Sequence, residues 1–300
     1  MASISGSSPI QALDSHTYTG NFETSWCIGS VPHGGYVTAY IMRVVSLHFS
    51  TTLSNQNQPH TIALHLEFLR RTQVGPATFV IKDTKLGRQS SIVHVTLTQD
   101  DREEIVGYIT QSNLNTEIGI TVDTQWKLHP VPPSTDVTAL KAGNDPLWEV
   151  PVLPFADFRK ATNNVKGFLP RAGQAGPLLA DQWIGFRSGE KIINEDVAFF
   201  ADMWPQILDN TASTKAETFW YPTLLMNLDV KKSLPAEGVD YLFVRVSAKH
   251  IKNGRYDLEV IIMDEDNELV ALSHHVCLAV SASRNLAQRS KLKREGGPKI

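Results

Sequence analysis

Apolar residues recur with helical spacing in two stretches of the chain, one in each half. Such residues between 193 and 210 are Val197, Phe200, Ala201, Trp204 and Leu208. Those between 36 and 49 are Tyr36, Ala39, Tyr40, Val44 and Leu47. Intervals of three and four place side chains on one helix face. We therefore predict helices over 36–49 and 193–210, with Asn194 as N-cap and Glu195 and Asp196 at the positive end of the second.

Segments with alternating or β-branched residues follow both predicted helices. The expected strands of the first half are 61–70, 77–85, 91–99 and 104–112, and those of the second half are 223–232, 241–250, 256–264 and 268–279. A further strand precedes each helix, over 22–29 and 182–189. The same order of elements thus occurs twice.

Direct comparison of the halves indicates an internal repeat. The stretch TIALHLEFLRR at 61–71 parallels TLLMNLDVKKS at 223–233, with Thr61 over Thr223. Further along, Gln111 falls over His275. A helix followed by antiparallel strands must bury its apolar stripe on the sheet, and packing two copies together covers the other helix face. We therefore expect a pseudo-twofold arrangement with both helices near its interface.

Seven prolines interrupt the region between the repeats: Pro130, Pro132, Pro133, Pro146, Pro151, Pro154 and Pro170. Regular structure is not expected over 122–176. Trp148, Phe155 and Phe158 indicate a linker held against the protein, open to a role as part of a lid. The predicted units are 1–125, the linker 126–176, the second unit 177–283 and a solvated basic tail 284–300.

Composition narrows the class of protein. The chain has 300 residues, 42% of them hydrophobic, which supports a real core. A net charge of −3 gives no reason to expect nucleic acid as a partner. Two cysteines cannot build a disulfide framework, and no apolar run reaches the roughly 18 residues of a membrane span. The N-terminus lacks secretory features, so we expect a cytoplasmic protein without a membrane partner.

Asp202 is the candidate catalytic acid or base. Phe199 lies beside it on the face opposite the apolar stripe, and a helix that is apolar on both sides is usually buried on both sides. Two interpretations remain open, a buried carboxylate or a carboxylate in water, because Asp is rarely buried unpaired.

Five short motifs carry a family resemblance: Val31-Pro32-His33-Gly34-Gly35-Tyr36, Phe68-Leu69-Arg70, Ala201-Asp202-Met203, Pro222-Thr223-Leu224 and Leu269-Val270-Ala271. With them, residues 22–280 resemble the acyl-CoA thioesterase II-like family. The resemblance implies an α+β double hotdog fold, in which two tandem hotdog units each have an antiparallel sheet wrapped around a central helix. Sheet edges in this fold can pair between chains, so a homodimer stays open.

The same resemblance implies residue roles. The family uses an Asp, a Thr and a Gln to hold and activate water, and these positions fall on Asp202, Thr223 and His275. The histidine is a departure from the family pattern. His275 could orient the water, act as the base, or simply be a strand histidine bonded to backbone. At most one of His274 and His275 faces the site, since successive strand residues point to opposite sides.

Residues at the start of the first helix, together with nearby aromatic residues, are candidates for binding substrate. Gly34 and Gly35 offer backbone N–H groups for an oxyanion or phosphate, although glycine there also suits an ordinary turn. His33 could polarise a carbonyl group of the substrate, or it could be a solvent-exposed residue that caps the helix. The remaining candidates, which would line a broad apolar pocket, are Tyr36, Phe199 and Trp204.

Other types of site are not predicted. Neither His60 with His65 nor His274 with His275 has a further cluster of metal ligands, and no nucleotide fingerprint is present, so no metal or cofactor is expected. The first helix has Ile41 or a neighbour at the position over Asp202, with no carboxylate nearby, so we expect one working site.

Three functions remain open on these grounds. The first is hydrolysis of an acyl-CoA or acyl-carrier thioester by base-activated water. The second is a repurposed double hotdog enzyme whose acid–base chemistry dehydrates, isomerises or cyclises a polyketide-like substrate, as the replacement of Gln by His275 suggests. The third is an acyl-binding protein without turnover. The sequence leaves the acyl chain and its carrier undetermined.

Overall fold

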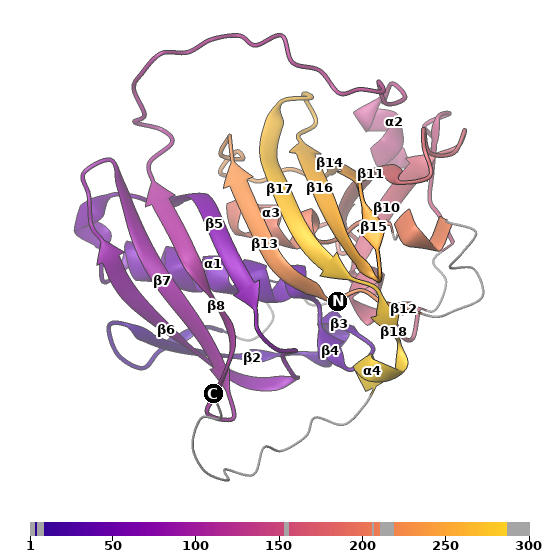
Figure 1. The fold of residues 1–300 in the computed structure, drawn as a ribbon. Coiled ribbons are helices and arrows are strands. Elements are labelled where there is room, and N and C mark those ends of the chain that lie inside the picture. Colours follow the sequence, from indigo (N-terminus) through magenta and orange to yellow (C-terminus); the bar gives the residue numbers. More distant parts are fainter. Residues whose placement is uncertain (1–3, 5–8, 153–155, 206, 211–218, 287–300) are drawn as a thin grey trace.

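A large antiparallel sheet with few helices forms the protein (Figure 1). The computed structural model describes residue 4 and residues 9–152, 156–205, 207–210 and 219–286. The first-half strands of the sheet are β1 (Gln11–Ala12), β2 (Thr17–Phe22), β5 (His60–Phe68), β6 (Gly75–Lys85), β7 (Ser90–Gln99) and β8 (Arg102–Ser112). The remaining strands of the sheet are β9 (Trp148–Glu149), β10 (Val165–Pro170), β11 (Leu179–Phe186), β13 (Thr223–Val230), β14 (Leu242–Ser247), β15 (Ile251–Lys252), β16 (Arg255–Met263) and β17 (Leu269–Leu278).

Short elements complete the fold. Two small ladders pair β3 (Cys27–Ile28) with β4 (Val31–Pro32) and β12 (Phe219–Trp220) with β18 (Val280–Ser281). The α-helices are α1 (Gly34–Ser50), α2 (Val137–Ala142), α3 (Val197–Ala201) and α4 (Ser283–Leu286). The 3-10 turns are η1 (Thr24–Trp26), η2 (Ser54–Gln56), η3 (Lys160–Asn164), η4 (Asn194–Asp196) and η5 (Ile207–Asn210). Within the described residues, every helix falls short of the length and apolarity that a bilayer span requires.

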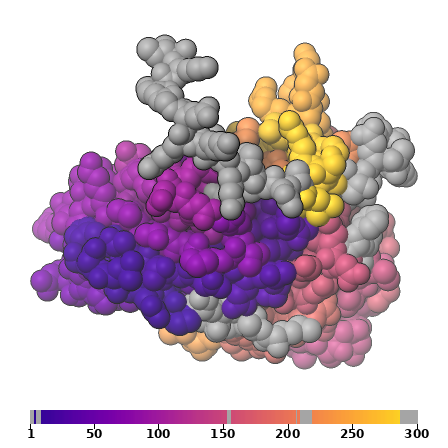
Figure 2. Space-filling model, turned by 90° about the horizontal axis from the view of Figure 1, so that it is seen from below, coloured from indigo at the N-terminus to yellow at the C-terminus, as the bar shows by residue number. Residues whose placement is uncertain are grey.

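The main sheet is symmetric about its centre, because equivalent strands of the two halves follow one another outward in the same order. The first half runs β2, β6, β7, β8, β5 and the second half continues β13, β17, β16, β14, β11. At the centre β5 pairs with β13, and His65 lies opposite Asn227. Figure 2 shows the indigo-to-magenta residues of the first half on one side and the rose-to-orange residues of the second on the other. The predicted repeat is therefore visible in the topology.

The pairing register corrects one equivalence between the halves. Thr61 pairs with Gln111, and its counterpart Thr223 pairs with Cys277. Cys277 is therefore the counterpart of Gln111, and His275 is the counterpart of Ile109, so the equivalence of Gln111 and His275 is wrong. The turn between β16 and β17, from Met263 to Leu269, is longer than the turn between β7 and β8, from Gln99 to Arg102, and local similarity across turns of unequal length misplaces the following strand by two positions.

Helix α1 forms over the predicted residues and packs against β5, β6 and α3. The prediction of a second helix over 193–210 is wrong beyond Ala201, where α3 ends. Pro205 has no backbone N–H with which to continue a helix. Asn194 is not the N-cap, because Ile193 precedes η4 and the Asn194 side chain instead bonds Ser233 and Leu234.

Several segments differ from the local predictions. The expected strand 22–29 is broken by η1, and regular structure does form inside the proline-rich region as α2 and β10. A second apolar cluster holds this region against the sheet, and its buried members are Leu128, Leu140, Trp148, Phe168, Trp183, Tyr241 and Phe243. Phe155 lies outside the described residues.

The start of the predicted solvated tail is also ordered against the protein. Asn285 is fully buried, and its side chain bonds the backbone of Ser30 and Ile28. The expectation of a solvated tail is therefore wrong at Asn285, while residues 287–300 lie outside the described part of the chain. The division into units at 125, 176 and 283 stays a prediction.

Candidate active site

Asp202 lies where α3 ends against the start of α1. It is the C-cap residue of α3, and its Oδ2 accepts a hydrogen bond from the Gly35 backbone N–H at 2.7 Å. That N–H belongs to the first turn of α1, whose amides have no partner within the helix and attract negative charge. The side chain is 9% exposed, so the interpretation that Asp202 points into bulk water is wrong.

Two imidazoles flank this carboxylate from opposite halves of the chain. Nδ1 of His33 lies 3.7 Å from Asp202 Oδ2, and Nδ1 of His275 lies 3.7 Å from Asp202 Oδ1. Both nitrogens are buried and lack a hydrogen-bond partner among the described residues. Both distances exceed hydrogen-bond length, so small movements could bring either ring into contact with the carboxylate.

Hydrogen bonds on the far side of the His275 ring select its tautomer. The Ser273 hydroxyl donates to the Asn227 carbonyl at 2.5 Å, so its oxygen is left to accept from His275 Nε2–H at 2.9 Å. Nδ1 then carries a lone pair directed toward Asp202. Burial lowers the pKa of His275 to about 4, against the opposing effect of the Asp202 charge, and the ring is neutral near pH 7. Burial also lowers the pKa of His33.

Thr223 reaches the site from the head of β13, where a β-bulge interrupts the ladder. Its Oγ1 lies 3.7 Å from Cys277 Sγ. Burial, together with the charge of Asp202, raises the pKa of the Cys277 thiol, which disfavours a thiolate nucleophile. Burial also raises the pKa of Tyr256, whose buried hydroxyl interacts with the Cys277 side chain.

A cavity of about 270 Å³ opens beside Asp202 and Thr223. His33 and Gly34 lie in its wall, and Met203 and Trp204 continue the wall from Asp202. Aromatic and apolar side chains also line it: Phe68, Phe158, Phe219, Trp220 and Tyr221. The linker between the halves therefore contributes to the cavity through Phe158, and its role as part of a lid stays a prediction. His275 does not line this cavity and lies behind the carboxylate.

Three of the expected binding residues lie behind the cavity wall. Gly35 holds Asp202 through its backbone N–H. Tyr36 is fully buried and stacks on Trp26, with ring centroids 5.3 Å apart. Phe199 is also fully buried and meets the His33 ring edge-on at 5.7 Å. These three residues support the wall from behind, whereas His33, Gly34 and Trp204 border the cavity itself.

Sequence reasoning missed a group of arginines at the cavity. Arg70 and Arg71 follow the end of β5, and Arg159 comes from the linker. The Arg70–Arg71 pair directly after a strand was a readable signal, whereas Arg159 is brought in only by the folding of the linker. Guanidinium groups bind phosphate strongly through paired N–H donors. The cavity thus joins an apolar, aromatic wall to a cationic one.

Comparisons with known proteins agree with this arrangement. The family model of the acyl-CoA thioesterase N-terminal domain matches residues 22–112, and that of the acyl-CoA thioesterase C-terminal domain matches residues 132–279. The thioesterase-like protein TwmA of Talaromyces wortmannii is 35% identical to this chain, over 96% of this chain and 95% of its own length.

Solved structures show the hotdog fold. Acyl-CoA thioesterase II TesB2 from Mycobacterium marinum has a TM-score of 0.65 at 16% identity, covering 92% of this chain and 97% of that chain. A hot dog fold protein from Alicyclobacillus acidocaldarius has a TM-score of 0.68 at 15% identity, covering 91% and 96%. The two matched domains together span most of the sequence, and this chain belongs to the acyl-CoA thioesterase family.

Proposed function

We propose that this chain is an acyl thioesterase, with Asp202 as the base that activates water. The observation that carries the proposal is the position of the Asp202 carboxylate. It borders the cavity, accepts a hydrogen bond from the start of α1 and lies between the imidazole rings of His33 and His275. A carboxylate held in this way can take a proton from water while its own orientation stays fixed.

The reaction then needs few other groups. Water oxygen attacks the thioester carbonyl carbon as its proton passes to Asp202, and the carbonyl oxygen becomes negative near the positive end of α1 at Gly34. When the carbon–sulfur bond breaks, the proton goes to the leaving sulfur, so that the products are a carboxylic acid and a thiol. Thr223 would hydrogen-bond the water, and His275 would act as a positioning residue through Asp202.

The arginines support a phosphate-bearing carrier. Coenzyme A and the phosphopantetheine arm of a carrier protein both carry phosphate at the end of the arm opposite the thioester, and Arg70, Arg71 and Arg159 line the same cavity as Asp202. The aromatic wall suits the apolar acyl part. We also propose that the two halves are tandem hotdog units, each with its sheet curved around a helix, joined by the linker 126–176.

A second function is favoured by the number of titratable groups. Hydrolysis requires one base, whereas His33 and His275 flank Asp202, and the buried Tyr256 hydroxyl is near enough for the Asp202 charge to affect its pKa. Such a set could also move protons within a polyketide-like acyl chain, giving dehydration, isomerisation or cyclisation. In this case the substrate would change while the thioester stayed intact.

A panel of acyl-CoA and acyl-pantetheine thioesters tests both functions. Free thiol is measured together with the mass of the acyl product, for the wild type, Asp202→Asn and Glu195→Gln. Glu195 is the matched control, because it lies near Thr61, the first-half counterpart of Thr223.

We expect one mole of thiol per mole of acid, a loss of about 10²- to 10⁴-fold in Asp202→Asn, and unchanged turnover in Glu195→Gln. Equal rates in the wild type and Asp202→Asn on every good substrate would refute the role of Asp202. Substrate consumed without thiol release would replace hydrolysis by the second function.

A further inference from the structure

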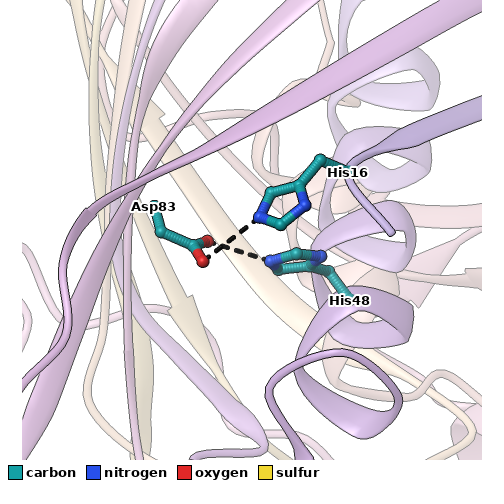
Figure 3. Close-up of side chains that lie close together, drawn as sticks. All are labelled: His16, His48 and Asp83. Atoms are coloured by element: carbon teal, nitrogen blue, oxygen red, sulfur yellow. Dashed lines mark hydrogen bonds and ion pairs between the residues drawn. The ribbon is translucent and has the colours of Figure 1, made fainter. Parts of the chain in front are cut away.

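Three side chains from separate elements meet in the first half (Figure 3). His16 lies just before β2, His48 is in the last turn of α1, and Asp83 is on β6. His16 Nε2 lies 3.2 Å from Asp83 Oδ2, and His48 Nε2 lies 3.0 Å from Asp83 Oδ1. The candidate ligand atoms all lie within 4.8 Å of one another. None of the three residues belongs to the Asp202 site.

The spacing of these atoms suits a shared divalent ion. Zinc binds imidazole nitrogen at about 2.0–2.1 Å and carboxylate oxygen at about 2.0–2.2 Å, so two ligand atoms in a tetrahedral site lie about 3.3–3.5 Å apart. The observed histidine–carboxylate separations of 3.2 and 3.0 Å are slightly shorter than this, and all the candidate ligand atoms lie within 4.8 Å of one another. Two imidazoles and a carboxylate form a donor set for zinc and neighbouring transition ions.

The second nitrogen of His48 has the partners expected for a metal ligand. Its Nδ1 lies 3.1 Å from the Ser15 carbonyl oxygen, which can only accept a hydrogen bond, and 2.9 Å from the Tyr18 hydroxyl. The Tyr18 hydroxyl itself donates to the same carbonyl at 3.1 Å. A proton on Nδ1 satisfies this arrangement and would leave the Nε2 lone pair for an ion, whereas without an ion Nε2 needs its proton to donate to the acceptor-only Asp83 carboxylate. Metal-bound histidines commonly donate their other N–H to a backbone carbonyl in this way.

Burial differs across the cluster. The His48 side chain is fully buried, whereas those of His16 and Asp83 are 39% and 24% exposed. An ion could therefore enter from the His16 side and keep a water as a further ligand. It would link the turn before β2 to α1 and would add to the β2–β6 ladder, which begins at the Thr17–Val80 pair beside the Ile81 N–H bond to the His16 carbonyl.

We propose that His16, His48 and Asp83 form a binding site for a divalent transition-metal ion of the zinc class, and that the ion stabilises the first half. The role is structural, because the three residues contribute nothing to the cavity beside Asp202. The sequence does not reveal this site, because its ligands are 32 and 35 residues apart and match no short metal-binding motif.

The test uses the full chain after dialysis against a chelator. Zn²⁺ is titrated by calorimetry, Co²⁺ is followed by its visible absorption, and the melting temperature is measured with and without Zn²⁺. The variants are His16→Ala and Asp83→Asn. Both residues are partly exposed, so folding of each variant can be verified by circular dichroism before titration. His94→Ala is the control, because His94 contacts Tyr108 on the sheet and lies outside the cluster.

We expect one ion per wild-type chain, a tetrahedral-type Co²⁺ spectrum and a higher melting temperature with Zn²⁺. Each cluster variant should bind at least about tenfold more weakly and lose the thermal shift, while His94→Ala should match the wild type. Wild-type protein without bound ion at saturating Zn²⁺ would overturn the proposal and leave a purely hydrogen-bonded triad. Binding that is unaffected in both cluster variants would also overturn it, because the ion would then sit elsewhere.

Discussion

Thr61 and Thr223 occupy equivalent positions at the central strands of the two halves, but their surroundings differ. Gln111 Nε2 donates to Thr61 Oγ1 at 2.8 Å, and the nearby cavity, which Met42 and Glu195 help to line, measures only about 10 Å³. Such a space is close to the limit for a single water molecule. Thr223 instead borders a cavity of about 270 Å³ shared with Asp202.

The difference between these two regions begins in the helices. Helix α1 continues for 17 residues, so its side chains fill the space near Thr61. Helix α3 has only five residues, and its end exposes Asp202, Met203 and Trp204 to the cavity. The region around Thr61 is therefore closely packed and that around Thr223 is open, although the strands are arranged in the same way. The short helix is the feature that makes room for the cavity.

The largest effect is expected at Gly35, where α1 approaches the end of α3. A Cβ at this position would lie 2.8 Å from both Asp202 Cβ and the Phe199 carbonyl oxygen. Gly35→Ala should therefore displace Asp202, lower thioester turnover about 10²-fold and destabilise the protein by about 1–3 kcal/mol. Gly119→Ala is the matched control, because a Cβ there would have nothing within 4 Å. Turnover and urea unfolding measure the pair, and wild-type turnover in Gly35→Ala would contradict this contact.

A smaller effect should distinguish the two equivalent threonines. Thr223→Val removes a hydroxyl from the cavity and should reduce turnover about tenfold, the value of roughly one hydrogen bond. Thr61→Val should leave turnover unchanged but destabilise the protein by about 1–3 kcal/mol, because buried Gln111 loses its acceptor. Kinetics and unfolding of both variants provide the comparison. If both variants lost activity equally, the functional asymmetry of the halves would be wrong.

The smallest effect on stability at neutral pH is expected at His275, whose counterpart in the first half is the non-titrating Ile109. The folded-state pKa of His275 is about 4, below the usual 6.5, so the unfolded chain binds more protons between these values. The His275 contribution to stability is therefore complete above about pH 6.5 and is lost as the pH falls through about 4. His275→Gln should flatten this decline in the free energy of unfolding, while His33 retains its own contribution in the same direction. Identical slopes from denaturant titrations at several pH values would show that His275 does not titrate in this way.

Strand and repeat patterns were more predictable than helix ends. Alternation of apolar residues located β5 to β8, and the similarity of 61–71 to 223–233 matched the register in which His65 faces Asn227. The end of α3 was only partly predictable: Pro205 indicates a break, but the apolar spacing continues to Leu208 and the helix stops earlier still, at Ala201. Strand β10 was not predicted, because its proline suggested an irregular segment. The strand forms because Phe168 packs into the second apolar cluster.

By itself the sequence determined the duplication, the sheet-rich fold and the motifs around Asp202 and Thr223, because periodicity and local similarity are properties of neighbouring residues. Only the tertiary structure decided that Cys277, not His275, is the counterpart of Gln111, and that Arg159 joins Arg70 at one cavity. It alone also brought His16, His48 and Asp83 together. These relationships depend on turn lengths and on packing between distant segments, which the order of residues along one strand or helix does not contain.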